Sequence, residues 1–198
     1  MVKLLYQGHG SIRFTVKNGQ VIYVDPYAGE GYDKPADIVL ITHDHFDHNK
    51  LELVTQNSGC KVVTSKEALA GGKHNCFLFD EITIEATEAQ NLLHSSKKCV
   101  GFILTLDGVK VYCSGDTSKT KQMQEFSKQK IDYALFCGDG IFNMGPKEAA
   151  ECAELVAAKH NILIHVKPRA LFDLEKAQKW AAPNKLIIQP GEEIELEN

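Results

Sequence analysis

One seven-residue segment, residues 42–48, holds three histidines and two aspartates directly after an apolar, strand-like stretch. Imidazole nitrogens and carboxylate oxygens are ligands for zinc and related divalent metals. In extended backbone, residues two apart point the same way, so His43 and His45 can face one ion. Asp47 and His48 follow a turn and can face a second ion beside the first. The alternative is a solvated loop that has this composition by chance, and metal binding explains the segment better.

Two ions need more ligands than this segment supplies, because a catalytic zinc takes about three protein ligands and keeps one position open for water. Three residues elsewhere suit this role. Asp116 ends a strand-like stretch, where the small Ser114-Gly115 pair would let its carboxylate approach both ions. His165 ends an apolar strand, and His94 lies in a polar loop. Taken singly, each has an ordinary alternative: a turn aspartate, a core histidine and an exposed histidine.

Short strands must position most of these residues. Apolar residues alternate along residues 2–25, with a turn at Asn18-Gly19 that favours positive φ, and Asp107-Gly108 marks a second hairpin. A nearly continuous apolar strand covers residues 37–42 and leads into the histidine-rich segment. We expect Phe46, within that segment, to turn back toward the core.

Helical periodicity is concentrated in the last third of the chain. Apolar residues at helical spacing predict a helix over residues 146–157, opened by Pro146, and another over residues 171–180. Asn49 is suited to cap a helix over residues 50–56. Hairpins and crossover helices mixed within residues 1–198 predict one domain of layered α/β architecture.

Composition excludes several classes of protein. With 43% hydrophobic and 24% charged residues over 198 positions, the chain has the profile of one compact globular domain. A net charge of -4 leaves no basic stripe for nucleic acid, and the apolar runs are too short to cross a membrane. Six cysteines without CxxC spacing are expected to be reduced, and no secretory signal is evident, so we expect a cytoplasmic protein.

The order of these features resembles the metallo-β-lactamase superfamily. The chain has an HxHxDH motif at residues 43–48 and a later lone histidine, His94. A strand-like stretch then ends in Gly-Asp-Thr at residues 115–117, and a final one ends in His165. The resemblance extends from Gly8–Ser11 and Asp25-Pro26 through residues 142–150. The resemblance therefore covers most of the chain.

This resemblance implies a fold and a ligand set. The fold would be a four-layer αβ/βα sandwich, with two mixed sheets between helical layers and the site where the strand-end loops converge. One ion would be held by His43, His45 and His94, and the second by Asp47, His48 and His165, with Asp116 bridging the two. All seven positions carry the expected residue type, which disfavours a degenerate, metal-free relative.

The chain is most similar to the short metal-dependent hydrolases of the superfamily. That group includes lactonases that act on sugar phosphates and phosphodiesterases of the phospholipid type. Its members often begin with a Gly-His-Ser or Gly-His-Ala hairpin, whereas this chain reads Gly8-His9-Gly10. The substrate class implied is a small, anionic ester, lactone or phosphodiester.

The expected reaction is hydrolysis, because metal coordination lowers the pKa of water toward about 7 and polarises the group attacked. Asp47 and Asp116 are both expected to be metal ligands, and Asp47 could also orient the water. Residues expected to hold the ligand imidazoles from behind are His9, Asp25 and Asp44. Residues expected at the substrate or on the pocket wall are Lys167, Arg169, Asn143 and Asp139.

Several alternatives stay open at the level of sequence. Histidine and carboxylate ligands accept several metals, and we rank zinc first, manganese second and iron third. A diiron redox protein could use a similar ligand set, and a binding or sensing protein could retain the metals without turnover. The sequence does not separate lactone from phosphodiester, because substrate specificity lies in loops. We also expect a homo-oligomer.

Overall fold

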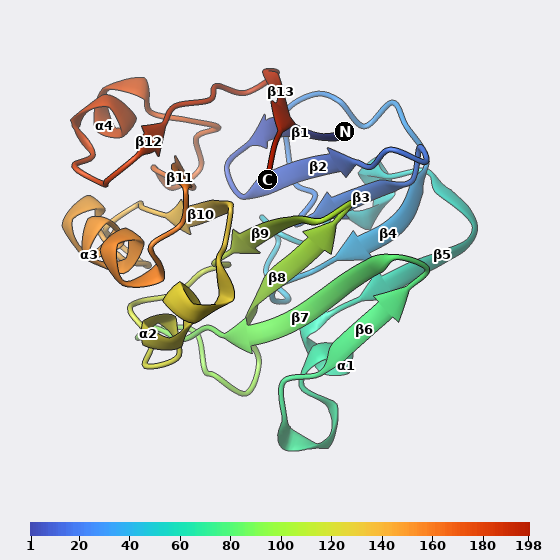
Figure 1. Ribbon diagram of the computed structural model, residues 1–198, viewed down its shortest axis with the longest axis horizontal. Helices are drawn as coiled ribbons and strands as arrows, with labels where there is room; N and C mark the ends of the chain where they lie inside the picture. The colour runs from blue at the N-terminus through green and yellow to red at the C-terminus, as the bar shows by residue number, and fades with distance from the viewer.

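The computed structural model describes residues 1–198 and consists of two mixed β-sheets packed face to face (Figure 1). The first sheet has six strands in the order β13-β1-β2-β3-β4-β5. Their bounds are Val2–Gly8 (β1), Ser11–Thr15 (β2), Val21–Val24 (β3), Ala36–Leu40 (β4), Gln56–Val63 (β5) and Glu193–Leu196 (β13). Because β13 pairs antiparallel with β1, the two ends of the chain meet in one sheet.

The second sheet has seven strands in the order β12-β11-β10-β9-β8-β7-β6. Their bounds are Cys76–Phe79 (β6), Ile82–Glu88 (β7), Val100–Leu106 (β8), Val109–Cys113 (β9), Tyr133–Cys137 (β10), His160–Ile164 (β11) and Lys185–Leu186 (β12). Strands β6 to β9 form an antiparallel meander, and β9 to β12 run parallel. The predicted Asp107-Gly108 turn joins β8 to β9, and both of its residues have positive φ, 46° and 86°.

Three helices cover the outer face of the second sheet: α2 (Met123–Phe126), α3 (Pro146–Val156) and α4 (Leu174–Lys179) (Figure 1). The predicted helix over residues 146–157 is therefore present, and Pro146 occupies its first turn, where no backbone donor is needed. The face that α3 buries carries small residues at helical spacing: Ala149, Cys152, Ala153 and Val156. The predicted helix over residues 171–180 is shorter, because Asp173 caps α4 through the Lys176 amide.

The main core lies between the two sheets and contains 28 buried residues from both of them. A second core of 17 residues lies between the second sheet and its helices. The outer face of the first sheet has a smaller core of six residues, covered by Tyr32 and Leu51. The predicted sandwich of two mixed sheets is thus confirmed, with a thinner helical layer over the first sheet than over the second.

One sequence prediction about an element was wrong. The expected helix over residues 50–56 is only a 3-10 turn, Leu51–Leu53 (η1), and Asn49 donates to Asp44 rather than capping it. Strand pairing explains the difference, because the Ala36 amide donates to Thr55 and β5 begins at residue 56 beside β4. The sequence analysis did not delimit β10, which lies between β9 and β11 in the second sheet.

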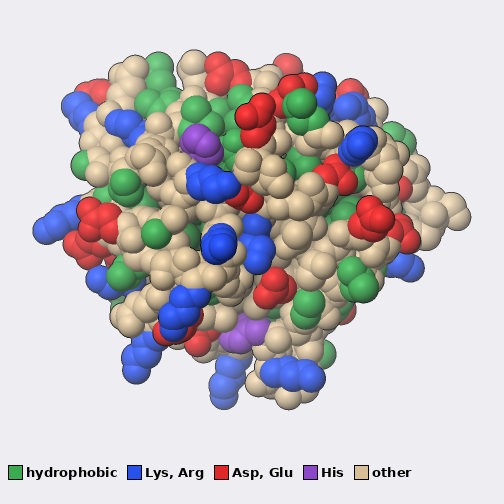
Figure 2. Space-filling model, in the orientation of Figure 1, with side chains coloured by type: hydrophobic (Ala, Val, Ile, Leu, Met, Phe, Trp, Pro, Cys, Tyr) green, Lys and Arg blue, Asp and Glu red, His purple; other side chains and the backbone are tan.

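The remaining short elements complete the connections. Helix α1 (Ser65–Ala68) follows β5 and has a capping box made by Thr64 and Glu67. Two further 3-10 turns are η2 (Ala70–Gly72) and η3 (Ser127–Gln129). No helix has the length and apolar character needed to cross a bilayer. On the face shown in Figure 2, basic and acidic side chains are interspersed.

Parallel strands place the chemically important loops at one edge of the sandwich. In the first sheet β3, β4 and β5 run parallel, and in the second sheet β9, β10 and β11 do. The carboxyl ends of parallel strands share an edge, which is where open α/β sheets bind ligands. The residues that follow these strand ends are Asp25 (β3), residues 41–48 (β4), Asp116 (β9), Asp139 (β10) and His165 (β11). The Val100 amide donates to the Thr42 carbonyl at 3.0 Å, which ties the two sheets together at this edge.

Candidate metal centre

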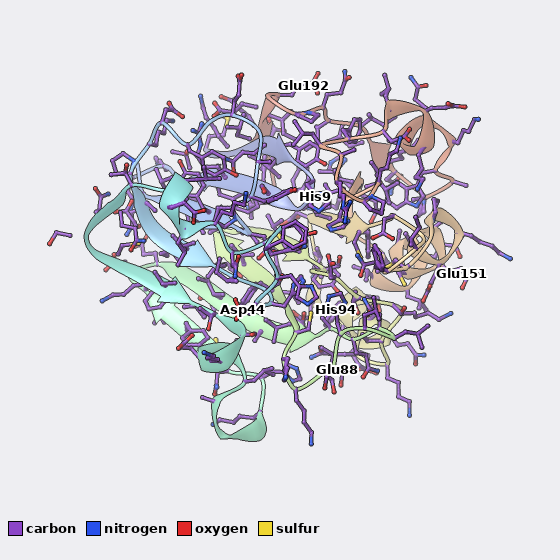
Figure 3. The ribbon with its side chains drawn as sticks, turned by 180° about the vertical axis from the view of Figure 1, so that it is seen from behind. His9, Asp44, Glu88, His94, Glu151 and Glu192 are labelled. Carbon is purple, nitrogen blue, oxygen red and sulfur yellow. The ribbon has the colours of Figure 1, made fainter.

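Six of the seven residues predicted as metal ligands gather in two adjoining clusters, and His9 joins one of them. In each cluster, all of the potential ligand atoms lie within 4.8 Å of one another. One consists of His43, His45 and His94, and the other of His9, Asp47, His48 and His165. His9 and His94 lie near the middle of the view in Figure 3. The chain thus brings together side chains from two strand ends and two loops, and His9 and His165 are 156 positions apart in the sequence.

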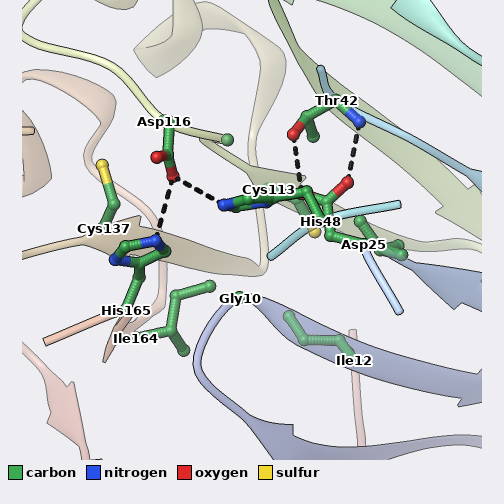
Figure 4. A pocket seen from close by; sticks show the side chains of 12 residues that line it. Gly10, Ile12, Asp25, Thr42, His48, Cys113, Asp116, Cys137, Ile164 and His165 are labelled. Carbon is green, nitrogen blue, oxygen red and sulfur yellow. Dashed lines mark hydrogen bonds and ion pairs between the residues drawn. The ribbon is translucent and has the colours of Figure 1, made fainter. Parts of the chain in front are cut away.

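Asp116 lies between the two clusters. Its Oδ1 atom is 3.5 Å from His48 Nε2 and 3.5 Å from His165 Nε2 (Figure 4). Its other oxygen, Oδ2, is 3.9 Å from His43 Nε2. The carboxylate therefore presents one oxygen to each side, which is the arrangement that a bridging ligand requires.

A hydrogen-bond chain behind the clusters sets the orientation of two imidazoles. Asp25 accepts from the backbone amide of Thr42 at 2.7 Å and from its hydroxyl at 2.6 Å. The same carboxylate accepts from His48 Nδ1 at 2.9 Å. Because the Thr42 hydroxyl gives its proton to Asp25, it accepts from His43 Nδ1, 3.0 Å away. Both rings thus carry a proton on Nδ1, and the Nε2 atom of each ring faces Asp116.

His94 and His165 also have polar side chains behind their rings. Asn91 Oδ1 accepts from His94 Nδ1 at 2.8 Å, which leaves His94 Nε2 to face His45 Nδ1, 3.0 Å away. On the other side, Asp139 Oδ2 lies 3.4 Å from His165 Nδ1. His45 therefore presents Nδ1 to the cluster, whereas the other ligand imidazoles present Nε2.

Unpartnered buried nitrogens show that the residues fit metal ions. The Nε2 atoms of His43, His48 and His165 are buried and have no hydrogen-bond partner. A buried polar atom without a partner costs roughly 1–3 kcal/mol, so three such atoms aimed at one carboxylate need compensation. Nitrogen and carboxylate donors are those that zinc, manganese and iron accept, and a divalent ion would satisfy all of these atoms.

The electrostatics of the site differ between its histidines and its bridging carboxylate. Burial and the charge of His48 lower the pKa of His43 to about 2, so its Nε2 lone pair is free at neutral pH. Burial opposes charge on His48, but Asp116 and Asp25 outweigh it and raise the pKa of His48 to about 9. Burial also opposes ionisation of Asp116, but the surrounding histidines hold its pKa well below the usual range. Asp116 is therefore a charged carboxylate.

His9 joins the second cluster more closely than we expected for a residue behind the ligands. Its Nδ1 atom donates to the Ala170 carbonyl at 3.1 Å, and its Nε2 atom lies 3.3 Å from Asp47 Oδ2. The rings of His9 and His165 are 3.8 Å apart between centroids. Burial opposes ionisation of Asp47, but His9 and the charge of His48 outweigh it and lower the pKa of Asp47. His9 thus holds Asp47 in place as a carboxylate.

The hairpin that carries His9 fits closely against the ligands. His9 and His165 both have positive φ, 56° and 47°, and the His165 amide donates to the His9 carbonyl at 2.8 Å. A Cβ atom at Gly10 would lie 3.2 Å from His48 Cε1. Glycine at this position, where the chain departs from the Gly-His-Ser or Gly-His-Ala pattern, therefore leaves room for the imidazole.

The other predicted site residues differ in their placement. Asp25 contacts His48, as described, whereas Asp44 is exposed, accepts from Asn49 and touches no imidazole. Lys167 is exposed and does not line the cavity beside the clusters, although Arg169 does. Phe46 is 63% exposed, so the prediction that it turns toward the core was wrong.

Asn143 has a more internal position than a substrate contact requires. It is buried, its Nδ2 atom donates to Asp139 at 2.8 Å, and its Oδ1 atom accepts from Asn91 at 2.7 Å. It therefore links the residues behind His94 and His165. The sequence analysis did not single out Asn91 or Thr42; each lies close in sequence to a ligand histidine, three residues before His94 and directly before His43.

Two hollows open beside the clusters and share His45, Leu93 and His94. The first has a volume of about 440 Å³ and is lined by His45, Phe46, Asp47, Leu93, His94, Asp116, Ile141, Phe142, His165, Pro168 and Arg169. The second has a volume of about 740 Å³, and three lysines, Lys66, Lys97 and Lys98, contribute to its wall. The clusters thus lie at the boundary between two spaces of substrate size.

Comparison with known proteins matches this chain to a family. The family model of the beta-lactamase superfamily domain matches residues 3–165. A metal-dependent hydrolase of Pyrococcus furiosus is 30% identical over 227 residues, covering 99% of this chain and 100% of that protein. The chain belongs to the metal-dependent hydrolases of the metallo-β-lactamase superfamily. This confirms the resemblance inferred from the order of the histidines and aspartates.

Several solved structures are also similar to this hydrolase. A crystal structure described as a metal-dependent hydrolase from Parabacteroides distasonis is 26% identical and has a TM-score of 0.74, covering 94% of this chain and 92% of that one. An isothiocyanate hydrolase from Delia radicum gut bacteria is 16% identical, with a TM-score of 0.74 over 98% of this chain and 99% of that one. At this identity the second likeness concerns the fold alone.

Proposed function

We propose that this hydrolase binds two divalent ions and uses them to hydrolyse an ester, lactone or phosphodiester bond of a small anionic molecule. The proposed ligands of one ion are His43, His45 and His94, those of the other are Asp47, His48 and His165, and Asp116 bridges them. The observation that carries this proposal is the position of Asp116, whose two oxygens face buried, unpartnered Nε2 atoms on both sides.

Bound divalent ions would supply a water of lowered pKa and would polarise the group that is attacked. The side chains around them have supporting roles. Asp47, which lines the 440 Å³ cavity, is held by His9 and can accept a hydrogen bond from the attacking water. Asp25 and Asp139 keep His48 and His165 oriented from behind. No nucleophilic side chain is needed in this mechanism.

Further parts of the proposal follow from the chemistry of the side chains. Zinc is the first choice of metal and manganese the second, because the donors are nitrogens and carboxylate oxygens. Arg169 is suited to contact an anionic group of the substrate. All six cysteines are free, which is typical of a protein in a reducing compartment such as the cytoplasm. We also propose that residues 1–198 act as one domain.

The test is metal content per chain, measured by plasma mass spectrometry on protein purified without chelator or nickel affinity. We expect about two zinc or manganese ions per chain in the wild type, far less in Asp116→Ala, and no change in Asp44→Ala. Asp44 is a matched control, because it lies in the histidine-rich loop without contacting an imidazole. Full metal content in Asp116→Ala would contradict the bridging role.

Two alternatives give different results in the same experiment. Predominant iron, together with a redox-active optical spectrum, would favour a diiron redox protein. Full zinc loading without hydrolysis of any ester, lactone or phosphodiester would favour a binding or sensing protein. No metal even after reconstitution would overturn the proposed ligand set.

A further inference from the structure

Three loops around the metal clusters carry exposed apolar side chains. Five of the ten large hydrophobic residues that are exposed in this chain lie on these loops: Phe46, Leu92, Leu93, Ile141 and Phe142. Leu93, Ile141 and Phe142 are 64%, 70% and 48% exposed. Single exposed hydrophobic residues are ordinary, but a group of them around a functional site indicates a surface that binds something apolar.

Four of these side chains line the cavity that opens onto the clusters. Phe46, Leu93, Ile141 and Phe142 share the 440 Å³ cavity with His45, Asp47, His94, Asp116 and His165. Its volume is within the range of small-molecule sites, which are mostly apolar with a few convergent polar groups. A molecule whose reacting bond lies at Asp116 would therefore place its adjoining atoms against an apolar wall.

One cation also lines this cavity. Arg169 is exposed and has no acidic partner within 4.0 Å. Its backbone has positive φ, 59°, in the turn that follows His165 and Pro168. A guanidinium without a partner, beside an apolar wall, is complementary to a carboxylate or phosphate on an otherwise apolar molecule.

We propose that the substrate is an anionic amphiphile. It carries an acyl or aryl group beside the bond that is cleaved, and this group packs on Phe46, Leu93, Ile141 and Phe142. Its carboxylate or phosphate contacts Arg169. This inference rests on the proposed hydrolytic function and narrows its substrate class. A second copy of the chain covering the same apolar side chains is the competing occupant.

The binding test does not depend on turnover. We would measure the Kd of octanoate and butyrate for the zinc-loaded protein by isothermal titration calorimetry. Any contribution of the carboxylate to binding at the ions is the same for both ligands, so their ratio reports the apolar wall. Each fully buried methylene strengthens binding about fourfold. We expect octanoate to bind at least tenfold more tightly than butyrate, and equal affinities would overturn the proposal.

Variants locate the apolar contact. In the double variant Ile141→Ser with Phe142→Ser, the preference for octanoate should fall at least threefold, because both side chains line the cavity. Leu78→Ser is the matched control: Leu78 is 70% exposed, like Ile141, but lies on β6 and lines a different hollow. An equal loss of preference in Leu78→Ser would overturn the assignment of the wall. Circular dichroism melts verify that the variants fold.

Kinetic tests separate this inference from the proposed function. Bis(4-nitrophenyl) phosphate and methyl 4-nitrophenyl phosphate share a charge and a leaving group but differ in the second aryl group. We expect the wild type to favour the diaryl ester in kcat/KM, and the Ile141→Ser with Phe142→Ser variant to lose at least threefold of that advantage. Hydrolysis with an undiminished advantage in the variant would overturn the inference alone. If neither ester is hydrolysed, the alkanoate titration still decides the inference.

Two further outcomes decide the anionic contact and the competing occupant. Arg169→Ala should raise KM for the diaryl phosphate about tenfold, whereas Lys167→Ala, two residues away and outside the cavity, should not change it. A KM increase in Lys97→Ala instead would place the anion in the lysine-lined hollow and overturn the role of Arg169.

A dimer in analytical ultracentrifugation that dissociates in the Ile141→Ser with Phe142→Ser variant would assign the apolar side chains to a second copy.

Discussion

Asp25 holds His48 from behind through a 2.9 Å hydrogen bond to Nδ1, and through Thr42 it also reaches His43. One buried carboxylate thus orients a ligand in each of the two clusters. Neither ring can turn without breaking the chain of hydrogen bonds that begins at Asp25. The orientation of two proposed metal ligands therefore depends on a residue that is not itself a proposed ligand.

We predict that Asp25→Asn weakens metal binding about 10- to 100-fold, the usual effect of losing a group that orients a ligand histidine. Competition with a chromogenic zinc chelator measures this affinity. Asp37→Asn is a suitable control, because Asp37 accepts from the Val21 amide in the same sheet and contacts no imidazole. Unchanged zinc affinity in Asp25→Asn would show that His48 and His43 keep their orientation without the carboxylate.

Gly115 determines how closely Asp116 approaches the clusters. Its φ is 60°, and a Cβ atom there would lie 2.5 Å from the Val100 carbonyl oxygen. We expect Gly115→Ala to lower the free energy of unfolding by about 2 kcal/mol or more and to reduce metal content. Urea denaturation measures the first effect and mass spectrometry the second.

The variant Gly71→Ala separates the cost of positive φ from the cost of the contact with the Val100 carbonyl. Gly71 also has positive φ, 74°, but a Cβ atom there would have no neighbour within 4 Å. It should cost only the conformational part, about 1 kcal/mol, with metal content unchanged. Equal losses in the two variants would mean that the contact with Val100 does not matter.

Asn143 links Asn91, which holds His94, to Asp139, which lies beside His165. We predict that Asn143→Ala weakens metal retention and lowers the free energy of unfolding by about 1–2 kcal/mol, because it leaves buried polar groups unpaired. Dialysis against a weak chelator, followed by metal analysis, measures retention. A higher KM with unchanged metal content would instead make Asn143 a substrate contact, as the sequence first suggested.

Removing the metals should destabilise the fold measurably. A ligand present at about 1,000 times its Kd stabilises the native state by about 4 kcal/mol. For a chain of this size we expect chelation to lower Tm by roughly 8–16 °C, since 1 kcal/mol corresponds to about 2–4 °C. Differential scanning calorimetry before chelation, after it and after zinc is returned measures the change. An identical Tm in all three states would argue against metal binding at the clusters.

The sequence by itself determined the chemistry of the centre. His43, His45, Asp47 and His48 lie within six residues after one apolar strand, so local geometry alone predicts a metal-binding loop. The hairpin at Asp107-Gly108 and helix α3 were likewise predictable, because turn residues and helical periodicity act over a few positions.

Tertiary structure decided which residues complete the centre and how they are held. Asn91, Asp139 and Asn143 contact one another or the ligands only because separate loops converge at the edge of the sandwich. The helix expected over residues 50–56 is reduced to the turn η1, because Thr55 and Gln56 pair with Ala36 at the start of β4. Exposure of Phe46 and Ile141 at the cavity is also a property of the assembled loops. Local residue patterns specify turns, periodicity and ligand types, whereas pairing and packing between distant segments depend on the whole fold.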